Sequence, residues 1–450
     1  MQESEIRARV SAMMPEVLGD LERLVAIPSI AFPGSPPEPV HEMAAEVVAR
    51  FQAAGVANAS LQDVPEGYPP VYGEIAGPEG SPTVMFYAHY DVQPAPPEQG
   101  WTTDPWTPTR KDDGRIYGRG AADDKGGLAI HLGTLKVFDG KPPCTVKLIV
   151  EGMEETNSNL EAFVEAHPDL FACDVFIVCD MGNLRVGEPT LTTTLRGDVA
   201  CVVTLTTLQH PLHSGLFGGP APDAMMSMAE LLATLHDEDG NVAVEGVSRY
   251  DWDGLDFSAD DFRAAADLAD GVALTTAEEP VSTRLWSSPS VSVIGLDMTS
   301  VDGSSNVLIP EVRAKLSMRI VPGADPAREL DALVAHLESH VPWGARIEIE
   351  RTKEAPPFRC ETDGPGYAAA REALETAYGK PAGEAGSGGS IPLLQTLQGA
   401  APDAEFILWG PEDTALARIH ASDESVDPSE IEHMILAQAF LLQDLAGGTG

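Results

Sequence analysis

Cysteine is scarce in this sequence of 450 residues, and the few that occur form no recognisable set. The five cysteines are an odd number, and none stands in a C-x-x-C pair. This pattern argues against a disulfide framework and against a zinc site built from thiolates. We expect the cysteines to behave as small buried hydrophobic residues in a reducing compartment.

Basic residues are also few, because Lys and Arg together number 28 against 70 Asp and Glu, a net charge of −42. Nucleic-acid binding needs a basic surface that neutralises phosphates, and none is visible. The same deficit argues against contact with an anionic membrane surface through basic residues. We interpret the acidity as a well-hydrated, self-repelling surface.

Long apolar runs are missing as well. No stretch of 18 or more apolar residues occurs, and residues 1–5 carry neither the basic nor the apolar segment of a secretory signal. The sequence therefore predicts a cytoplasmic protein without a membrane span. Its 43% hydrophobic and 22% charged residues are typical of a globular protein, and its length predicts two or three cores.

Predicted strands and helices alternate in the first part of the chain. The predicted strands are 83–92, 145–151 and 174–180, and the predicted helices are one ending near 26 and those at 41–54, 127–138 and 160–167. The pattern returns after 357, with helices at 367–378 and 428–445 and a strand at 405–409. Such alternation is typical of α/β proteins with a mostly parallel sheet and helices on both faces.

The middle of the chain has a different order. Predicted strands at 199–208, 291–298, 312–321 and 346–350 and helices at 223–236 and 326–340 give β-α-β-β-α-β, the ferredoxin-like unit. The acidic, partly helical segment 241–288 is interpreted as an excursion from this unit. We predict one domain formed by residues 1–193 and 357–450, interrupted by an inserted domain of residues 194–356.

Histidine and acidic residues follow three predicted parallel strands. His89 and Asp91 end the first, Glu154 and Glu155 follow the second, and Asp180 ends the third. Each of these alone is commonly accidental. Open α/β sheets bind ligands at the carboxyl ends of their strands, so three such events indicate one site.

A glycine-rich loop at residues 118–127 precedes the first crossover helix. It does not fit G-x-G-x-x-G, and Asp123 and Asp124 occupy the place where a pyrophosphate would approach. An acidic loop favours a cation. Among the eleven histidines, His420 is the best placed to add a nitrogen ligand, whereas His433 lies inside the last helix. Two imidazoles and three carboxylates, one of them bridging, suit two zinc ions about 3.5 to 4 Å apart, with manganese or cobalt as alternatives.

Five motifs occur in an order that resembles a known family. They are Ala88-His89-Tyr90-Asp91-Val92, Gly118 to Gly127, Val150 to Glu155, Leu212 to Gly219, and Gly388-Gly389-Ser390-Ile391-Pro392. The chain resembles, over nearly its whole length, the dinuclear zinc metallopeptidases that include carnosine dipeptidase, glutamate carboxypeptidase, aminoacylase and succinyl-diaminopimelate desuccinylase. Its motifs are most similar to the dipeptidase branch.

The resemblance implies a role for each residue of the site. His89, Asp123 and Asp180 would hold one zinc ion, and Asp123, Glu155 and His420 the other. Asp91 would accept a proton from the His89 ring, and Glu154 would be the general base. The family also implies a cis peptide bond between Asp123 and Asp124.

The resemblance further implies a homodimer, in which the inserted domain serves as lid and dimerisation domain. His213 would act in the partner's active site on the tetrahedral oxyanion, with Asn306 as a further candidate nearby. Apolar and polar residues alternate along the predicted strand 312–321, which leaves Arg319 on its polar face. Arg319 matches the family's carboxylate clamp. Gly389 and Ser390 match the loop that assists it.

One departure bears on the substrate, since carnosine-specific members carry a histidine in the segment equivalent to residues 363–366 and this chain has none there. This departure puts carnosine itself in doubt as the substrate. We predict a cytoplasmic metal-dependent dipeptidase or short-chain exopeptidase that cleaves an amide bond beside a free carboxylate. An N-acyl-amino-acid deacylase is the alternative, because it uses the same metals and the same clamp. A catalytically dead scaffold is disfavoured, because every metal ligand and the base are present.

Overall fold

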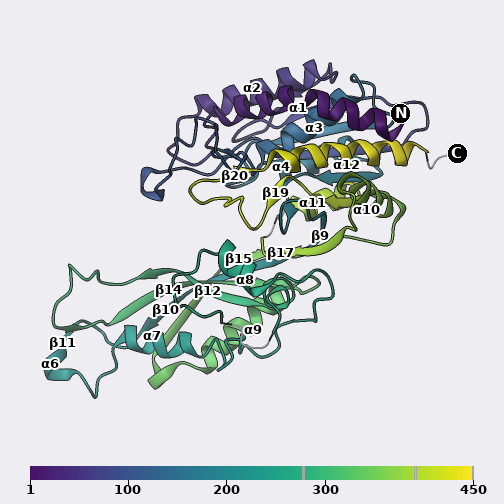
Figure 1. Ribbon diagram of the computed structural model, residues 1–450. Coiled ribbons are helices and arrows are strands. Elements are labelled where there is room, and N and C mark those ends of the chain that lie inside the picture. The colour runs from purple at the N-terminus through teal and green to yellow at the C-terminus, as the bar shows by residue number, and fades with distance from the viewer. Residues whose placement is uncertain (276–278, 390, 392, 448–450) are drawn as a thin grey trace.

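The chain folds into two lobes, each built on its own β-sheet (Figure 1). The computed structural model describes residues 1–275, 279–389, 391 and 393–447. The larger lobe contains both ends of the described chain, and the smaller lobe is formed by its middle part.

The larger lobe contains a nine-stranded sheet. Its order is β1 (Ser60–Leu61), β2 (Val71–Ile75), β6 (Thr145–Glu151), β3 (Thr83–His89), β7 (Val175–Val178), β18 (Glu405–Leu408), β9 (Thr190–Leu195) and β16 (Phe358–Arg359), with β17 (Gly383–Ser387) beside β9. The four central strands β6, β3, β7 and β18 run parallel. The predicted α/β class is therefore confirmed.

Helices cover both faces of this sheet. One face packs against α1 (Glu3–Val25), α2 (Glu38–Ala53), α3 (Lys125–Val137), α10 (Pro365–Tyr378) and α12 (Pro428–Gly447). The other face packs against α4 (Leu160–Ala166), α5 (Pro168–Phe171) and α11 (Leu393–Ala400). Strand β3 shows why the sequence favours this arrangement, because Phe86 and Ala88 enter the first core and Met85 and Tyr87 the second. Both faces are buried, so the strand is a continuous apolar run.

The smaller lobe has a four-stranded antiparallel sheet. Its order is β12 (Ser290–Asp297), β14 (Glu311–Ile320), β10 (Gly197–Thr206) and β15 (Arg346–Ala355). Helices α7 (Ala224–Ala233) and α9 (Pro326–Ser339) pack on one face, and Asp325 caps α9 by accepting a hydrogen bond from the Arg328 N–H at 3.0 Å. The chain order is β10-α7-β12-β14-α9-β15, which confirms the predicted ferredoxin-like unit. We keep 194–356 as the proposed insertion, although Thr194 and Leu195 pair within the larger sheet.

Several strands were not predicted. Strands β9 and β17, with the sequences TLTTTL and GEAGS, contain mainly small or polar residues, so they lack the apolar run that indicates a strand. The excursion at 241–288 contains α8 (Ala259–Ala265) and a turn at Thr283–Ser287, and it packs through Phe257 and Trp286 against Leu184 of the larger lobe. Across the described ranges, no helix combines the length and apolar character needed to cross a membrane.

Asp20 links three helices of the larger lobe. Its side chain is buried, and it binds Arg23 at 2.5 Å, Lys136 at 2.6 Å and also Arg50. Burial opposes ionisation, but hydrogen bonds from Lys136 and Arg23 hold the pKa of Asp20 below its ordinary value of 3.8.

We expect Asp20→Asn to lower the free energy of unfolding by about 1–3 kcal/mol, because the variant weakens charged hydrogen bonds to α1, α2 and α3. Urea unfolding at pH 7 measures the loss, with Glu16→Gln as the control because the exposed Glu16 shares only Lys136. A group whose pKa is lower in the folded than in the unfolded state stabilises the fold at any pH above its unfolded pKa. This stabilisation is lost as the pH falls through the folded pKa. The difference between the two proteins should therefore shrink below about pH 4, and a constant difference would contradict the assignment.

Candidate metal centre

The acidic and histidine residues at the carboxyl edge of the parallel strands lie close together. His89 ends β3, Glu154 and Glu155 follow β6, and Asp180 follows β7. These strands are adjacent and parallel, so their carboxyl ends meet at one edge of the sheet. Asp123 comes from the turn before α3, which also reaches this edge.

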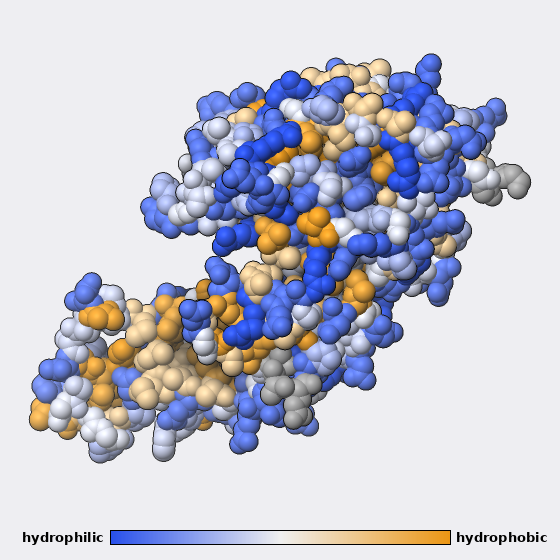
Figure 2. Space-filling model, in the orientation of Figure 1, coloured by the Kyte–Doolittle hydropathy of each residue, from blue (hydrophilic) through white to orange (hydrophobic). Residues whose placement is uncertain are grey.

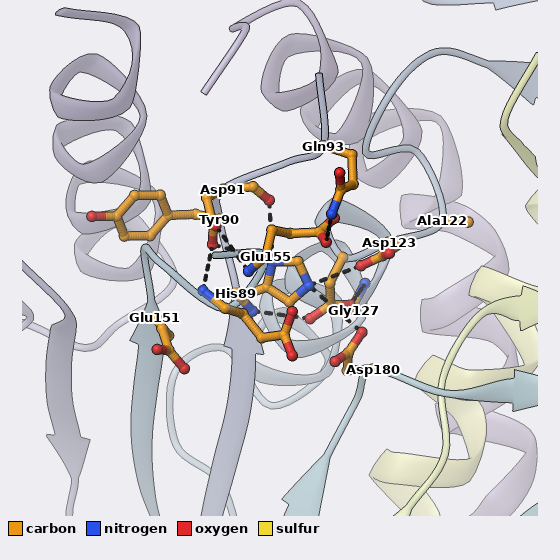
Figure 3. A network of polar contacts seen from close by, with 12 residues as sticks. His89, Tyr90, Asp91, Gln93, Ala122, Asp123, Gly127, Glu151, Glu155 and Asp180 are labelled. Atoms are coloured by element: carbon orange, nitrogen blue, oxygen red, sulfur yellow. Dashed lines mark hydrogen bonds and ion pairs between the residues drawn. The ribbon is translucent and has the colours of Figure 1, made fainter. Parts of the chain in front are cut away.

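The first group of candidate ligands contains His89, Asp123 and Asp180. His89 Nε2 lies 2.8 Å from Asp123 Oδ1 and 3.6 Å from Asp180 Oδ1, and all three residues are buried. Figure 3 shows the three side chains pointing toward one another. Their ligand atoms all lie within 4.8 Å of one another, as a shared cation requires.

The second group contains Asp123, Glu155 and His420. His420 Nε2 lies 3.0 Å from Asp123 Oδ2 and 3.1 Å from Glu155 Oε2. His420 comes from the loop between β19 (Glu412–Asp413) and β20 (Ser425–Val426), which completes the centre from the far end of the chain. Asp123 therefore presents one carboxylate oxygen to each group.

The electrostatics of the centre fit a cation. Burial opposes charge on His89, but Asp180, Asp123 and Asp91 raise its pKa well above its ordinary value. Burial likewise opposes charge on His420, whose pKa is raised to about 11 by Asp123 and Glu155. Burial raises the pKa of Asp180 to about 6 despite His89. Carboxylates that hold protons on neighbouring imidazoles form a site where metal ions can replace those protons.

Asp91 organises the centre from behind. Its carboxylate accepts hydrogen bonds from the backbone N–H groups of Glu154 and Glu155, each at 3.1 Å. His89 Nδ1 lies 3.1 Å from the Asp91 backbone oxygen and 3.5 Å from Asp91 Oδ1. Asp91 therefore fixes both the imidazole orientation and the turn that carries the glutamate pair.

Three comparisons connect this centre to known proteins. The profile of peptidase family M20/M25/M40 matches residues 85–444, which is more than half of the chain. The chain belongs to this family. A cysteinylglycine-S-conjugate dipeptidase of Corynebacterium striatum is 39% identical to this chain, and the match covers 80% of this chain and 81% of the relative. A β-Ala-His dipeptidase of Rattus norvegicus is 30% identical, and the match covers 75% of this chain and 73% of the relative. The crystal structure of human carnosine dipeptidase 1 is similar with a TM-score of 0.82, 25% identity and 99% coverage of both chains.

The predicted resemblance to the dipeptidase branch of these metallopeptidases is thus confirmed. This M20 peptidase is a metal-dependent enzyme, and its two ligand groups are the candidate sites for metal. The peptide bond between Asp123 and Asp124 is cis, as the resemblance implies.

Glu154 directly precedes the candidate ligand Glu155 in the sequence and is partly exposed. Burial raises the pKa of its carboxyl well above the ordinary value, and Asp180, Asp123 and Glu155 act in the same direction while His89 opposes them. A carboxyl group in such surroundings is suited to carry a proton.

His213 belongs to β11 (Leu212–His213), which lies at the tip of the smaller lobe, far from the larger lobe (Figure 1). β11 pairs with β13 (Val307–Leu308), and the Asn306 carbonyl accepts a hydrogen bond from the Ser214 N–H at 3.0 Å. Both His213 and Asn306 are exposed. Within one chain, the structure does not bring these two residues to the metal centre.

Arg319 lies on β14 opposite Asp198 and Ser290 and is partly buried. The apolar residues on the opposite face of β14 are buried, as the alternating pattern predicts. They are Val312, Ala314, Leu316, Met318 and Ile320. Gly389 is exposed and donates its N–H to Ser387 Oγ at 3.1 Å. Ser390 lies outside the described residues.

Sequence reasoning assigned no role at the site to three residues that hold the candidate ligands in place. Asp124 accepts hydrogen bonds from the His89 N–H at 3.0 Å and from the Gly127 N–H at 3.1 Å, which caps α3. Glu424 accepts a hydrogen bond from the Asp123 N–H at 3.2 Å, and its other carboxylate oxygen lies 2.7 Å from Arg119 Nη1. Gln93 Nε2 donates to Glu155 at 2.6 Å. Glu424 and Asp123 lie 301 positions apart, so no local pattern indicates their contact.

Proposed function

We propose that this M20 peptidase is a dipeptidase that cleaves the amide bond of dipeptides or short peptides with a free C-terminal carboxylate. The observation that carries the proposal is Asp123, whose two carboxylate oxygens face different histidines. The names of the bacterial and rat relatives support the substrate class. Because residues 363–366 lack histidine, we favour small dipeptides such as cysteinylglycine over carnosine.

We propose that two divalent cations bind here, one to each ligand group, with zinc as the first candidate. Oxygen and nitrogen ligands without thiolate suit catalytic zinc, and manganese and cobalt accept the same donors. When bound, such ions lower the pKa of water to about 7 and polarise a carbonyl group.

Glu154 is the proposed general base. It accepts the proton of the attacking water and delivers that proton to the leaving amine. The Asp91 carboxylate keeps Glu154 in place by accepting a hydrogen bond from the Glu154 backbone N–H. Arg319 pairs with the substrate carboxylate, assisted by Gly389 and Ser390.

We further propose a homodimer in which His213, with Asn306 beside it, completes the partner's active site as donor to the oxyanion. The exposed position of His213 at the tip supports this arrangement. Strand β12 is an edge strand with exposed apolar side chains, including Val293 at 46% and Ile294 at 57% exposed. Figure 2 shows apolar surface on this lobe. Exposed apolar edge strands tend to pair with another chain.

A substrate panel tests the activity. Free dipeptides should be cleaved, and N-acetyl and N-succinyl amino acids should not. Cleavage of only the acylated compounds would instead identify an N-acyl-amino-acid deacylase.

Replacing the shared ligand should remove more metal than replacing a ligand of one group. We expect Asp123→Ala to lose both ions and His420→Ala to lose one, measured as metal per chain by mass spectrometry after dialysis. Chelator treatment of the unaltered protein should abolish activity, and zinc, manganese or cobalt should restore it to different extents. Glu161→Gln, on the exposed surface of α4, is the control. Equal losses in the Asp123 and His420 variants would contradict a bridging role.

A further inference from the structure

A cavity of about 340 Å³ is lined by residues that neighbour two candidate metal ligands in the sequence. Its wall includes Met181, which follows the ligand Asp180, and Ile419, which precedes the ligand His420. Ser387 and Gly388 form another part of the wall, next to the loop proposed to hold the substrate carboxylate. The cavity wall therefore includes neighbours of both places where a dipeptide would have to be held.

Glu412 lies in the wall of this cavity and belongs to neither ligand group. Its backbone is fixed by parallel pairing of β19 with β8 (Gly182–Asn183). Within the described part of the chain, its carboxylate makes no hydrogen bond or ion pair. Arg418 lines the same cavity, but its Nη2 atom lies 3.6 Å from Asp267 Oδ2 and so pairs with that carboxylate instead. Burial raises the pKa of Glu412 well above its ordinary value, and Asp123, Asp180 and Glu424 act in the same direction while His420 opposes them. A cation placed in the cavity would stabilise this carboxylate.

Arg196 lies on the other side of Gly388, in the segment that joins β9 to β10. A Cβ atom on Gly388 would come within 3.0 Å of Arg196 Nη2, so the guanidinium lies against this loop. The Arg196 residue is only 7% exposed, and its Nε has no hydrogen-bond partner among the described residues. Nη1 reaches Ser290 Oγ at 3.1 Å and the Ser288 carbonyl at 3.5 Å.

Arg196 also makes no ion pair with any described carboxylate. Burial and the nearby Arg319 lower its pKa to about 10, although Asp198 opposes them. The Asp198 carboxylate is already bound by Ser317 at 2.5 Å and Lys353 at 2.8 Å. A buried guanidinium beside a second one is costly unless an anion compensates the charge.

We propose that Glu412 binds the α-ammonium group of a free dipeptide and that Arg196 joins Arg319 in binding its carboxylate. This inference rests on the proposed dipeptidase function and adds the reason why a free amino terminus is preferred. An ammonium group offers three donors to the Glu412 carboxylate, and a guanidinium fork matches a carboxylate in two parallel hydrogen bonds. Both residues are specificity determinants for the same reaction.

Substrates that lack one charge at a time test the two roles separately. The probes are alanylglycine, N-acetyl-alanylglycine and alanylglycine amide, followed by kcat/KM where they are cleaved and by inhibition constants where they are not. For Glu412→Gln we expect kcat/KM, or the affinity where a probe is not cleaved, to fall about 10- to 100-fold for the two probes with a free ammonium group. The N-acetyl probe should change little. For Arg196→Gln we expect a similar loss on the two probes with a carboxylate, and little change with the amide.

Each variant is the control for the other, because each should spare the probe that lacks its own partner. Arg196→Lys keeps the charge without the fork and should fall between the unaltered protein and Arg196→Gln. Metal content and thermal unfolding are measured for every variant. Equal losses on all three probes, or loss of metal from Glu412→Gln, would overturn the inference while leaving the dipeptidase function intact. Unaltered protein that cleaves N-acetyl amino acids and no free dipeptide would overturn the proposed function, and this inference with it.

Discussion

Replacing Glu154 with glutamine is expected to lower kcat for dipeptide hydrolysis by about 10²- to 10⁴-fold, the usual contribution of general acid–base catalysis. Glutamine keeps the shape of the side chain but can neither accept the water proton nor deliver it to the leaving amine. The ligand groups should survive, because Glu154 belongs to neither of them. The Asp91 contact should also survive, because it uses the backbone N–H of residue 154.

Three measurements separate this role from a structural one. Metal per chain should equal that of the unaltered protein, and KM should change little. The loss of activity should therefore be a decrease in kcat. Glu161→Gln should behave as the unaltered protein in all three. Turnover within a few-fold of normal in Glu154→Gln would refute the assigned base, and loss of metal would identify Glu154 as a ligand instead.

The parts of the fold that could be predicted are those where local pattern and tertiary environment agree. Strand β3 is a buried apolar run, and Asp325 with Pro326 indicates the start of α9, so both were located from sequence. Strand β9 consists largely of threonines, and it is a strand because β16, β17 and β18 pair with it. Pairing between segments far apart in the chain leaves no local signal.

The same distinction applies to the site. His89, Asp91 and Asp180 could be found because strand ends indicate where a parallel sheet binds ligands. Glu412 lies in the two-residue strand β19, and Arg196 is the single residue between β9 and β10. Their proposed roles are indicated only by what surrounds them, which is a cavity wall for Glu412 and a second guanidinium for Arg196. Such residues have no distinguishing sequence pattern, since an isolated Glu or Arg outside a long apolar element is commonly solvated.

His213 can be tested by combining two inactive proteins. Alone, His213→Ala should lose about 10²- to 10³-fold in kcat, as expected when one donor to an oxyanion is removed. Two different tags allow purification of heterodimers that contain one His213→Ala chain and one Glu154→Gln chain. If His213 serves the partner, the His213→Ala chain keeps its own Glu154 and receives an intact His213 from the other chain.

Each such heterodimer then has one complete site, and its activity should be about half that of the unaltered dimer. If His213 instead served its own chain, both sites would lack an essential group and the heterodimer would stay inactive. The exposure of His213 favours the first result, because its strand β11 lies at the tip of the smaller lobe, far from the larger lobe that carries the metal centre of the same chain. Sedimentation of the unaltered protein as a monomer at assay concentration would exclude action between subunits altogether.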